Sequence, residues 1–330
     1  FPWSLSVIGG RAQHLEYLAG LTRAACPPAQ ALVRYAALLA EDGRSTADAR
    51  AIMQRALRLA ALNPAAWSGL GDLAWQAGDK EDCLTLYRIA ACLDDTNEHL
   101  ASEYMRQCHI LGRGETGLAF LRNRLARLGA RSAAPALTLF EHLDSLERAG
   151  EGFAVLEAAL ATHPDDARLR VECVEALIRH GRLAEAERLL GPSGQGFRRA
   201  SWLRARAMLA EVQGDMPAAL VASREASVLQ PLNLAHHRMV ARLLASTESQ
   251  TAALDHIRAA CARHPQHYGL NRLLYDWLPR GSTEEEAQLR HLVALYPNDL
   301  WSLRELAIRL ADQQRWDEAE HFARALDVAA

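Results

Sequence analysis

Prolines stand just ahead of new apolar segments at several places in this chain, and the step from Pro231 to Pro265 is 34 residues. Between such prolines, apolar residues follow the helical period in two stretches of about 12 to 15 residues, joined by a short turn that often carries glycine. A unit of this kind cannot bury its apolar face alone, so it must stack on its neighbours. The period therefore predicts an all-α array of helix pairs for the 330-residue chain.

Four segments are the best copies of the recurring unit. They cover residues 67–95, 170–190, 203–231 and 303–326. The residues of the first copy that fall on a known repeat consensus are Trp67, Leu70, Gly71, Ala74, Cys83, Tyr87 and Ala90. The chain thus resembles the tetratricopeptide-repeat family, whose pattern is W-x2-L-G-x2-Y, then A-x3-F, then P, over about 34 residues.

The resemblance implies an all-α fold, a right-handed α-α superhelix (solenoid) of about nine tetratricopeptide-like helix pairs. The expected units begin near Gln30, Pro64, Glu98, Ala133, Ala167, Ala200, Leu234, Tyr268 and Leu300. Residues 30–330 would form the array. Residues 1–29 would form an N-terminal cap or half repeat, with an array cut from a longer protein as the alternative.

Gly71 stands inside an expected helix, where glycine costs about 1 kcal/mol relative to alanine. The resemblance implies that this position lies where the first helix of a repeat meets the second, so that only a small residue permits close approach. Ala207, Ala241 and Ala307 occupy the same position in later units. We therefore expect these four residues to be buried between helices.

Three expected units carry a large residue at that position, namely Met105, Phe140 and Tyr275, and we expect bends or irregular packing there. The segment GPSGQGF, residues 191–197, is linker-like and would divide the array into sub-arrays 30–191 and 198–330. Because the period resumes almost in phase after this segment, we interpret it as a loop inside one superhelix, with a break as the alternative.

The composition is that of a soluble globular protein, with 50% hydrophobic and 23% charged residues. A net charge of −3, with acids and bases interspersed, argues against a nucleic acid partner. No apolar run approaches the roughly 18 residues needed for membrane insertion. The six cysteines show no CxxC and no disulfide framework, so we expect free thiols and a cytoplasmic location.

The sequence shows no convergent set of catalytic residues. Five histidines lie between residues 236 and 267, but we expect them on different helix faces or in a turn, without the spacing of a zinc site. Cys108 and His109 are adjacent, so on a helix they point about 100° apart. We therefore expect no catalytic residue, no metal and no cofactor.

The resemblance implies that certain positions of each first helix line the concave groove of the superhelix. Arginines recur at two of these positions in the last four units, and they are Arg204, Arg238, Arg242, Arg272, Arg304 and Arg309. Stacked repeats would bring such residues within about 10 Å of one another, as one basic stripe. The same register directs Trp75 and Trp301 toward the groove as candidate ligand anchors. Toward the N-terminus the groove is expected to be acidic, with Asp72, Glu141, Asp144 and Glu175, partly offset by Arg106 and His109.

By resemblance, the expected function is a non-catalytic scaffold that binds an extended peptide or partner segment in its concave groove. The basic stripe predicts an acidic partner protein rather than a nucleic acid. The alternative is that the array is the recognition arm of a larger multidomain enzyme, such as a glycosyltransferase, whose catalytic domain lies outside these residues. A third interpretation, RNA binding by a related helical repeat, is disfavoured by the charge. The oligomeric state is left open.

Overall fold

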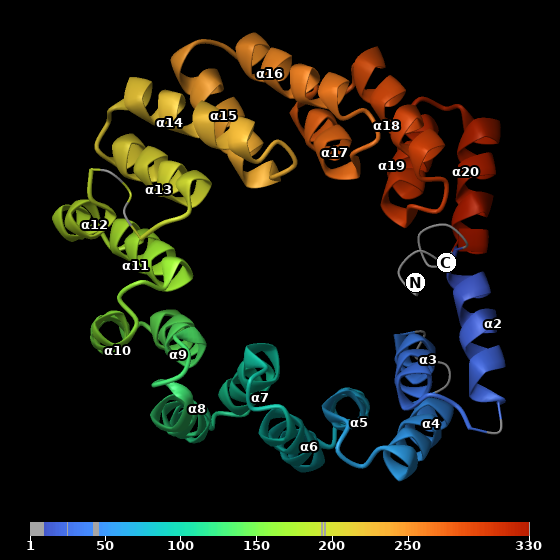
Figure 1. Cartoon of the computed structure of the whole chain (residues 1–330). Coiled ribbons are helices and arrows are strands. Elements are labelled where there is room, and N and C mark those ends of the chain that lie inside the picture. Colours follow the sequence, from blue (N-terminus) through green and yellow to red (C-terminus); the bar gives the residue numbers. More distant parts are fainter. Residues whose placement is uncertain (1–9, 25, 42–45, 193, 195, 330) are drawn as a thin grey trace. The chain divides into compact units, whose positions relative to one another are not determined.

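The computed structural model describes residues 10–24, 26–41, 46–192, 194 and 196–329 (Figure 1). All regular secondary structure in these residues is α-helical, which confirms the expected fold class. The helices are α2 (Gly10–Thr22), α3 (Ala29–Glu41), α4 (Thr46–Leu59), α5 (Pro64–Gln76), α6 (Lys80–Leu93), α7 (Glu98–Ile110), α8 (Gly114–Leu128), α9 (Ala134–Ser145), α10 (Ala149–Thr162), α11 (Ala167–Arg179), α12 (Leu183–Leu190), α13 (Arg199–Val212), α14 (Met216–Leu229), α15 (Leu234–Thr247), α16 (Gln250–Arg263), α17 (Tyr268–Trp277), α18 (Thr283–Leu295), α19 (Leu300–Asp312) and α20 (Trp316–Ala329).

The described helices after α2 form nine successive pairs, from α3 with α4 to α19 with α20. Six of the nine first helices begin at the residue expected from the sequence, and α3, α9 and α13 begin one residue away from it. The N-terminal segment that we expected as a cap or half repeat contains α2, while its residues 1–9 and 25 lie outside the described residues. The number and phase of the repeats are therefore as the 34-residue period predicts.

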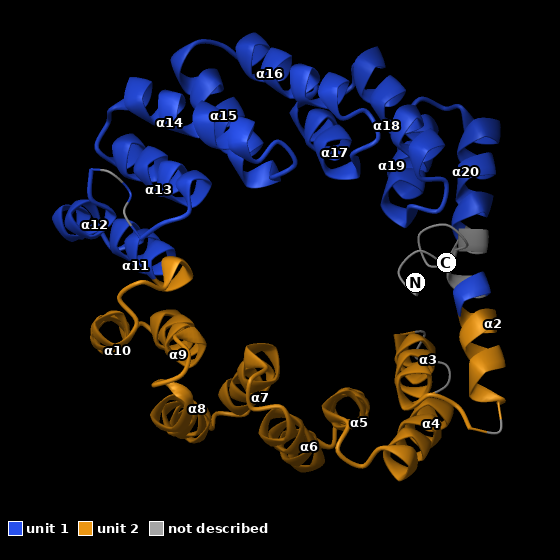
Figure 2. Cartoon of the chain, viewed as in Figure 1, with its two compact units in different colours: residues 1–14, 170–330 blue, residues 15–169 orange. Residues whose placement is uncertain are grey.

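The chain divides into two compact units (Figure 2). Unit 2, residues 15–169, contains the pairs from α3–α4 to α9–α10, and unit 1, residues 1–14 and 170–330, contains most of α11 and the pairs that follow it. The loop of residues 191–197, where the sequence suggested a possible division, lies inside unit 1. The indole N–H of Trp202 on α13 is directed at the carbonyl oxygens of Leu190 (3.3 Å) and Gly191 (3.4 Å), which holds the start of that loop.

Asparagine and aspartate side chains fix where several first helices begin. The Asn63 side chain accepts a hydrogen bond from the backbone N–H of Ala65 (3.1 Å), and Pro64 occupies the first turn of α5. Asn97 and Asp299 cap α7 and α19 in the same way. Such a cap pairs an N–H that the helix leaves free, and it contributes about 1 kcal/mol. The start of each of these helices is thus encoded locally.

The hydrophobic core of each unit consists of successive clusters of buried residues, several of which join a helix pair to the next first helix. In unit 2, buried residues of α3, α4 and α5 form one cluster, and in unit 1 buried residues of α15, α16 and α17 form another. Each pair is therefore covered by the first helix of the next pair. This nearest-neighbour burial is the physical basis of a repeat array.

Gly71 lies where α5 meets α6, as expected. A Cβ atom at this position would lie only 3.2 Å from two ring carbons of Tyr87. Ala207, Ala241 and Ala307, at the equivalent positions, are buried. The prediction that this position is a close contact between helices is confirmed, and for Gly71 the contacting group is an aromatic ring.

The large residues Met105 and Phe140 at that position are accommodated by glycines on the second helices. A Cβ atom on Gly152 of α10 would lie 2.9 Å from Phe140 Cδ2, and one on Gly117 of α8 would overlap the Met105 sulfur. In these two pairs the small residue is thus on the second helix and the large residue is on the first helix. In the third irregular unit, α17 has 10 residues and ends at Trp277, shortly before Pro279.

Candidate binding site

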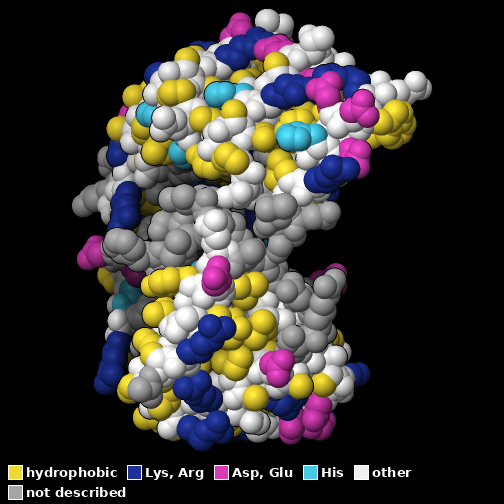
Figure 3. All heavy atoms as spheres, turned by 90° about the vertical axis from the view of Figure 1, so that its right-hand side faces the viewer, with side chains coloured by type: hydrophobic (Ala, Val, Ile, Leu, Met, Phe, Trp, Pro, Cys, Tyr) yellow, Lys and Arg dark blue, Asp and Glu magenta, His cyan; other side chains and the backbone are white. Residues whose placement is uncertain are grey.

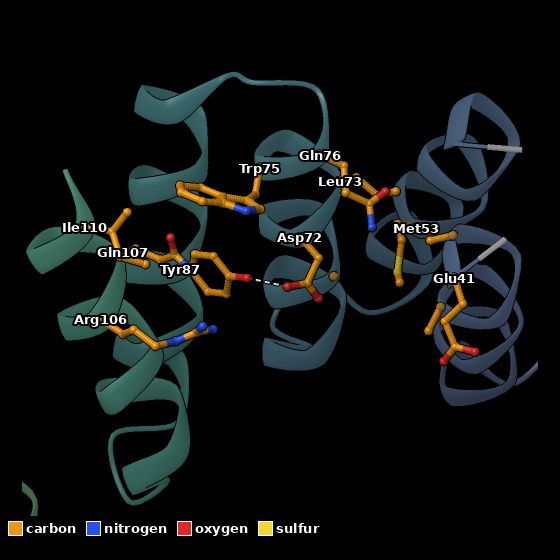
Figure 4. A pocket seen from close by; sticks show the side chains of 13 residues that line it. Glu41, Met53, Asp72, Leu73, Trp75, Gln76, Tyr87, Arg106, Gln107 and Ile110 are labelled. Carbon is orange, nitrogen blue, oxygen red and sulfur yellow. Dashed lines mark hydrogen bonds between the residues drawn. The ribbon is translucent and has the colours of Figure 1, made fainter. Parts of the chain in front are cut away.

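Unit 2 carries a hollow that we call the Trp75 pocket (Figure 4). Its volume is about 390 Å³, within the range of ligand pockets. The first helices α3, α5 and α7 supply most of the lining, and α4 and α6 supply one residue each. The lining residues are Ala37, Ala40, Glu41, Met53, Gly69, Asp72, Leu73, Trp75, Gln76, Tyr87, Arg106, Gln107 and Ile110.

Two glycines of α5 make room for two of these walls. A Cβ atom on Gly69 would overlap the end of the Met53 side chain, and one on Gly71 would press on the Tyr87 ring. Both Met53 and Tyr87 come from second helices, yet both reach the pocket. The two glycines therefore have a second effect besides close helix packing. They leave space beside α5 through which the side chains of Met53 and Tyr87 reach the pocket.

Asp72 and Tyr87 form a hydrogen-bonded pair in the pocket. The Tyr87 hydroxyl donates to Asp72 Oδ1, as the dashed line in Figure 4 shows. Burial raises the pKa of Asp72, and the hydrogen bond from Tyr87 opposes that rise. Burial also raises the pKa of Tyr87, so the phenol stays protonated and remains a donor. An ionised carboxylate can accept about four hydrogen bonds, so Asp72 keeps acceptor capacity toward the pocket.

Arg106 and Gln107 of α7 complete the polar part of the lining. The Arg106 guanidinium is paired with Glu103, one turn earlier on the same helix. Gln107 is 3% exposed, and its buried amide oxygen has no hydrogen-bond partner among the described residues. Leaving such an oxygen unpaired costs about 1 to 3 kcal/mol, so it is an unusual feature for a folded chain to retain.

The structure pairs five of the six groove arginines with carboxylates of the same unit. The pairs are Arg204–Glu175, Arg242–Glu211, Arg272–Asp276 (3.3 Å), Arg304–Glu305 (3.2 Å) and Arg309–Glu285 (3.7 Å). Arg238 is exposed and forms no ion pair with any described residue. Five of the arginines thus form ion pairs within unit 1, and the expected basic stripe stays a prediction.

The pairing is consistent with the mixed charge of the surface. Figure 3 shows one face of the molecule, on which basic and acidic side chains lie interspersed. For Arg204 and Arg242, the carboxylate comes from the preceding first helix. Burial raises the pKa of Glu175, and the charge of Arg204 opposes the rise. A role of these arginines in binding stays a prediction.

Trp75 and Trp301, both expected to face the groove, have different surroundings. Trp75 is 37% exposed and lines the pocket. Trp301 packs edge-on against Tyr275, with ring centroids 5.2 Å apart, and the guanidinium of Arg272 stacks over its ring at 3.1 Å. The Trp301 ring is therefore already engaged by its own unit.

His237 and His256 meet between α15 and α16, a contact that the sequence did not lead us to expect. His237 Nε2 lies 2.9 Å from the carbonyl oxygen of Pro231, which can only accept, so this nitrogen donates. His237 Nδ1 then accepts from His256 Nε2 at 3.1 Å. Burial lowers the pKa of His256 to about 4, and it also lowers the pKa of His237. Both imidazoles are neutral near pH 7.

Potential metal ligands and nucleophiles also occur elsewhere in the described ranges. These residues contain no group of three or more His, Cys, Asp or Glu arranged to hold a metal ion. Burial raises the pKa of Cys83 to about 11 and that of Cys173 to about 12, so both thiols are protonated at neutral pH and are weak nucleophiles. None of the described helices combines the length and apolar character that a bilayer span requires.

The stacked helix pairs and the pocket on their first helices define a helical repeat protein. A sequence model of the tetratricopeptide repeat matches residues 145–209. Over these residues the chain matches the tetratricopeptide repeat, the same repeat that the consensus residues of the first copy indicate.

Several solved structures are similar to this chain. The human IFIT1 dimer with PPP-AAAA is 15% identical, covers 100% of this chain and 82% of its own, and has a TM-score of 0.45. PilF of Pseudomonas aeruginosa is 17% identical over 65% of this chain and 97% of its own, with a TM-score of 0.37. The APC/C hetero-tetramer Cut9-Hcn1 is 14% identical over 84% of this chain and 54% of its own, with a TM-score of 0.40. A search of curated proteins finds no match.

Proposed function

We propose that this chain is a non-catalytic scaffold that binds an extended segment of another protein across the first helices of unit 2. The observation that carries the proposal is the Trp75 pocket, where an exposed indole and a carboxylate line one hollow together with Gln107, whose buried amide oxygen has no partner among the described residues. Tryptophans set in such hollows are typical of binding hot spots. The pocket is built by three consecutive repeats, so its occupant contacts the array rather than a single helix.

The spacing of the first helices suits an extended peptide. Packed helices lie about 8 to 10 Å apart, and an extended chain advances about 3.3 Å per residue. Every third residue of such a segment would therefore meet the next repeat. Side chains from α3, α5 and α7 would then read three positions of the segment, with the Trp75 pocket taking one side chain.

Arg238 supplies a second proposed contact, in unit 1. Its guanidinium is exposed and has no carboxylate partner among the described residues, so it can pair with an acidic group of a partner at no cost in existing ion pairs. Each of the other five arginines would first have to leave its own carboxylate. We therefore assign the expected preference for an acidic group to Arg238, and the remaining arginines keep a secondary role in the proposal.

A display selection of random peptides on the full chain tests the proposal. We expect extended sequences with dissociation constants in the micromolar range, which corresponds to about 8 kcal/mol of binding free energy. Trp75→Ala should weaken the selected peptides at least tenfold without changing the far-ultraviolet circular dichroism. Trp316→Ala is the matched control, because Trp316 is 64% exposed and lies on α20 of unit 1.

Two further measurements test the charge preference of the chain and its binding of RNA. Arg238→Glu should weaken binding of peptides that carry an acidic group, whereas Arg324→Glu, at an exposed position on α20, should not. RNA oligonucleotides at low salt should not bind, because the paired arginines leave little net positive charge to neutralise phosphates. Selection of no peptide, equal binding by the Trp75→Ala chain, or tighter binding of RNA than of any peptide would each contradict the proposed function.

A further inference from the structure

The Trp75 pocket offers hydrogen-bond acceptors that lack donors. In the described chain, the carboxylate of Asp72 accepts one side-chain hydrogen bond, from the Tyr87 hydroxyl. The amide oxygen of Gln107 accepts none, although Gln107 is 3% exposed. Figure 4 shows these side chains facing the same hollow. The Gln107 oxygen is thus a buried acceptor without a donor, and the exposed Asp72 carboxylate can accept further hydrogen bonds, so a ligand with several N–H groups suits the pocket.

The charges of the lining point the same way. Asp72 is acidic, and Arg106 is the one basic side chain among the lining residues. Its guanidinium is already paired with Glu103, whose side chain is 20% exposed. The net charge around the hollow is thus negative, so a carboxylate of the partner would be repelled there and a cation attracted.

Aromatic surface next to these acceptors favours a planar cation. The indole of Trp75 is 37% exposed, and the Tyr87 ring lies beside the Asp72 carboxylate. A guanidinium stacks on an indole and donates in its own plane at the same time, whereas an ammonium donates from a point. Five N–H donors in one plane match acceptors on two different helices better than three donors on a single nitrogen.

Unit 1 shows this grouping satisfied by the chain itself. The Arg272 guanidinium stacks over the ring of Trp301 at 3.1 Å, and its Nε lies 3.3 Å from the carboxylate of Asp276. Around Trp75 the indole and the carboxylate of Asp72 are present, and the arginine of the lining, Arg106, is paired with Glu103. An arginine stacks on Trp301, whereas none of the described arginines stacks on Trp75.

We infer that the Trp75 pocket binds the guanidinium of an arginine side chain in the partner segment, stacked on Trp75 and hydrogen-bonded to Asp72 and Gln107. This inference rests on the proposed function and names the residue that the pocket selects. The arginine of the partner pairs with the carboxylate of Asp72 in unit 2, and the preference for an acidic group that we assign to Arg238 is a separate contact in unit 1.

The test uses a blocked pentapeptide with central arginine and three analogues in which this residue is citrulline, lysine or norleucine. Citrulline has nearly the shape of arginine but no charge. The chain carries ¹⁵N-labelled tryptophan, and the indole N–H signal of Trp75 is assigned by its loss in Trp75→Phe. We expect the arginine peptide to shift this signal and to bind about 10 to 100 times more tightly than the citrulline peptide, the range for charge-assisted hydrogen bonds.

Asp72→Asn completes the test, because asparagine keeps an oxygen for the Tyr87 hydroxyl. In this variant the arginine peptide should bind about 10 to 100 times more weakly, and the preference over citrulline should fall below threefold. Asp312→Asn, at an exposed position on α19, is the matched control and should change neither value.

The outcomes separate this inference from the proposed function. Equal binding of the arginine and citrulline peptides would overturn the assignment of arginine, and so would an unchanged preference in Asp72→Asn. If the norleucine peptide shifts the Trp75 signal as strongly as the arginine peptide, the pocket still binds peptides and only the inference fails. If no peptide from this set or from the display selection shifts the Trp75 signal, both fail. The comparison of the four peptides on the unsubstituted chain tests the inference even if Asp72→Asn does not fold.

Discussion

Replacing Glu98 with alanine would remove the main partner of a buried arginine. Arg124 of α8 is 1% exposed, and its two terminal nitrogens donate to the two oxygens of Glu98 at 2.8 and 3.1 Å. One of them also donates to the backbone oxygen of Asp95. The Thr138 hydroxyl of α9 donates to the same Glu98 carboxylate at 2.7 Å. The carboxylate of Glu98 on α7 is therefore bound by side chains of α8 and α9, so it links three consecutive helices of unit 2.

The structure sets the size of the expected effect. Removing one partner of a buried ion pair costs about 3 to 5 kcal/mol. The side chain of Glu98 is 24% exposed, so water can reach the vacated position, and we expect the lower end, about 3 kcal/mol, for Glu98→Ala. Arg124→Met removes the buried charge and leaves the glutamate near water, so we expect about 1 kcal/mol. The double variant should then be more stable than Glu98→Ala alone.

Amide hydrogen exchange is the suitable assay, because repeat arrays open region by region and one melting temperature averages over them. A loss of about 3 kcal/mol corresponds to about a 100-fold increase in exchange. We expect this increase for the amides of α7, α8 and α9. Helices α15 and α16 of unit 1 serve as the internal control and should be unaffected.

Two results would refute this reasoning. The first is an increase in exchange of less than about fivefold in α7 to α9 for Glu98→Ala, since that corresponds to about 1 kcal/mol. The second is faster exchange in the double variant with Arg124→Met than in Glu98→Ala alone. Either result would mean that the guanidinium finds other partners once the carboxylate is gone.

Three further predictions concern packing and pH. Gly71→Val should lower the free energy of unfolding by about 2 kcal/mol in urea, because the branched side chain meets the Tyr87 ring, whereas Gly71→Ala should stay within about 1 kcal/mol. Gly117→Ala should destabilise the chain by about 1 to 3 kcal/mol in the same assay, while Gly150→Ala, where a Cβ meets open space, should not. Burial lowers the pKa of His256 to about 4, so the stability held by the neutral ring is complete above about pH 6.5 and is lost as the pH falls toward 4. The urea midpoint should fall between pH 7 and pH 5, and it should fall less in His256→Gln.

The helices were predictable because their signals are local. Asn63 followed by Pro64 starts α5 with a hydrogen bond that spans two residues, and the apolar period continues until a turn glycine. Gly78 has a φ of 79°, a conformation that suits glycine, in the turn after α5. Such features do not depend on the rest of the chain, so the number and phase of the repeats follow from the sequence.

The candidate site was predictable only in part. The register places Trp75 toward the groove, and it lines the pocket. Tyr87 matched the repeat consensus and was interpreted as core, although its hydroxyl also reaches Asp72. The neutralisation of Arg204 and Arg242 was missed, although carboxylates 29 and 31 residues upstream are the signal that could have shown it. That signal lies between repeats, whereas the expected stripe was inferred from equivalent positions of successive repeats.

The sequence by itself determined an array of helix pairs, where each pair begins, and that Gly71 must meet a neighbouring helix. Only the tertiary structure decided how the large residues fit. Phe140 was expected to disturb its pair, but Gly152 on the partner helix takes the place of the missing small residue. The physical reason is that packing depends on the summed volume of two facing side chains, and neither helix alone records what faces it. The same holds for the Trp75 pocket, whose walls come from five helices.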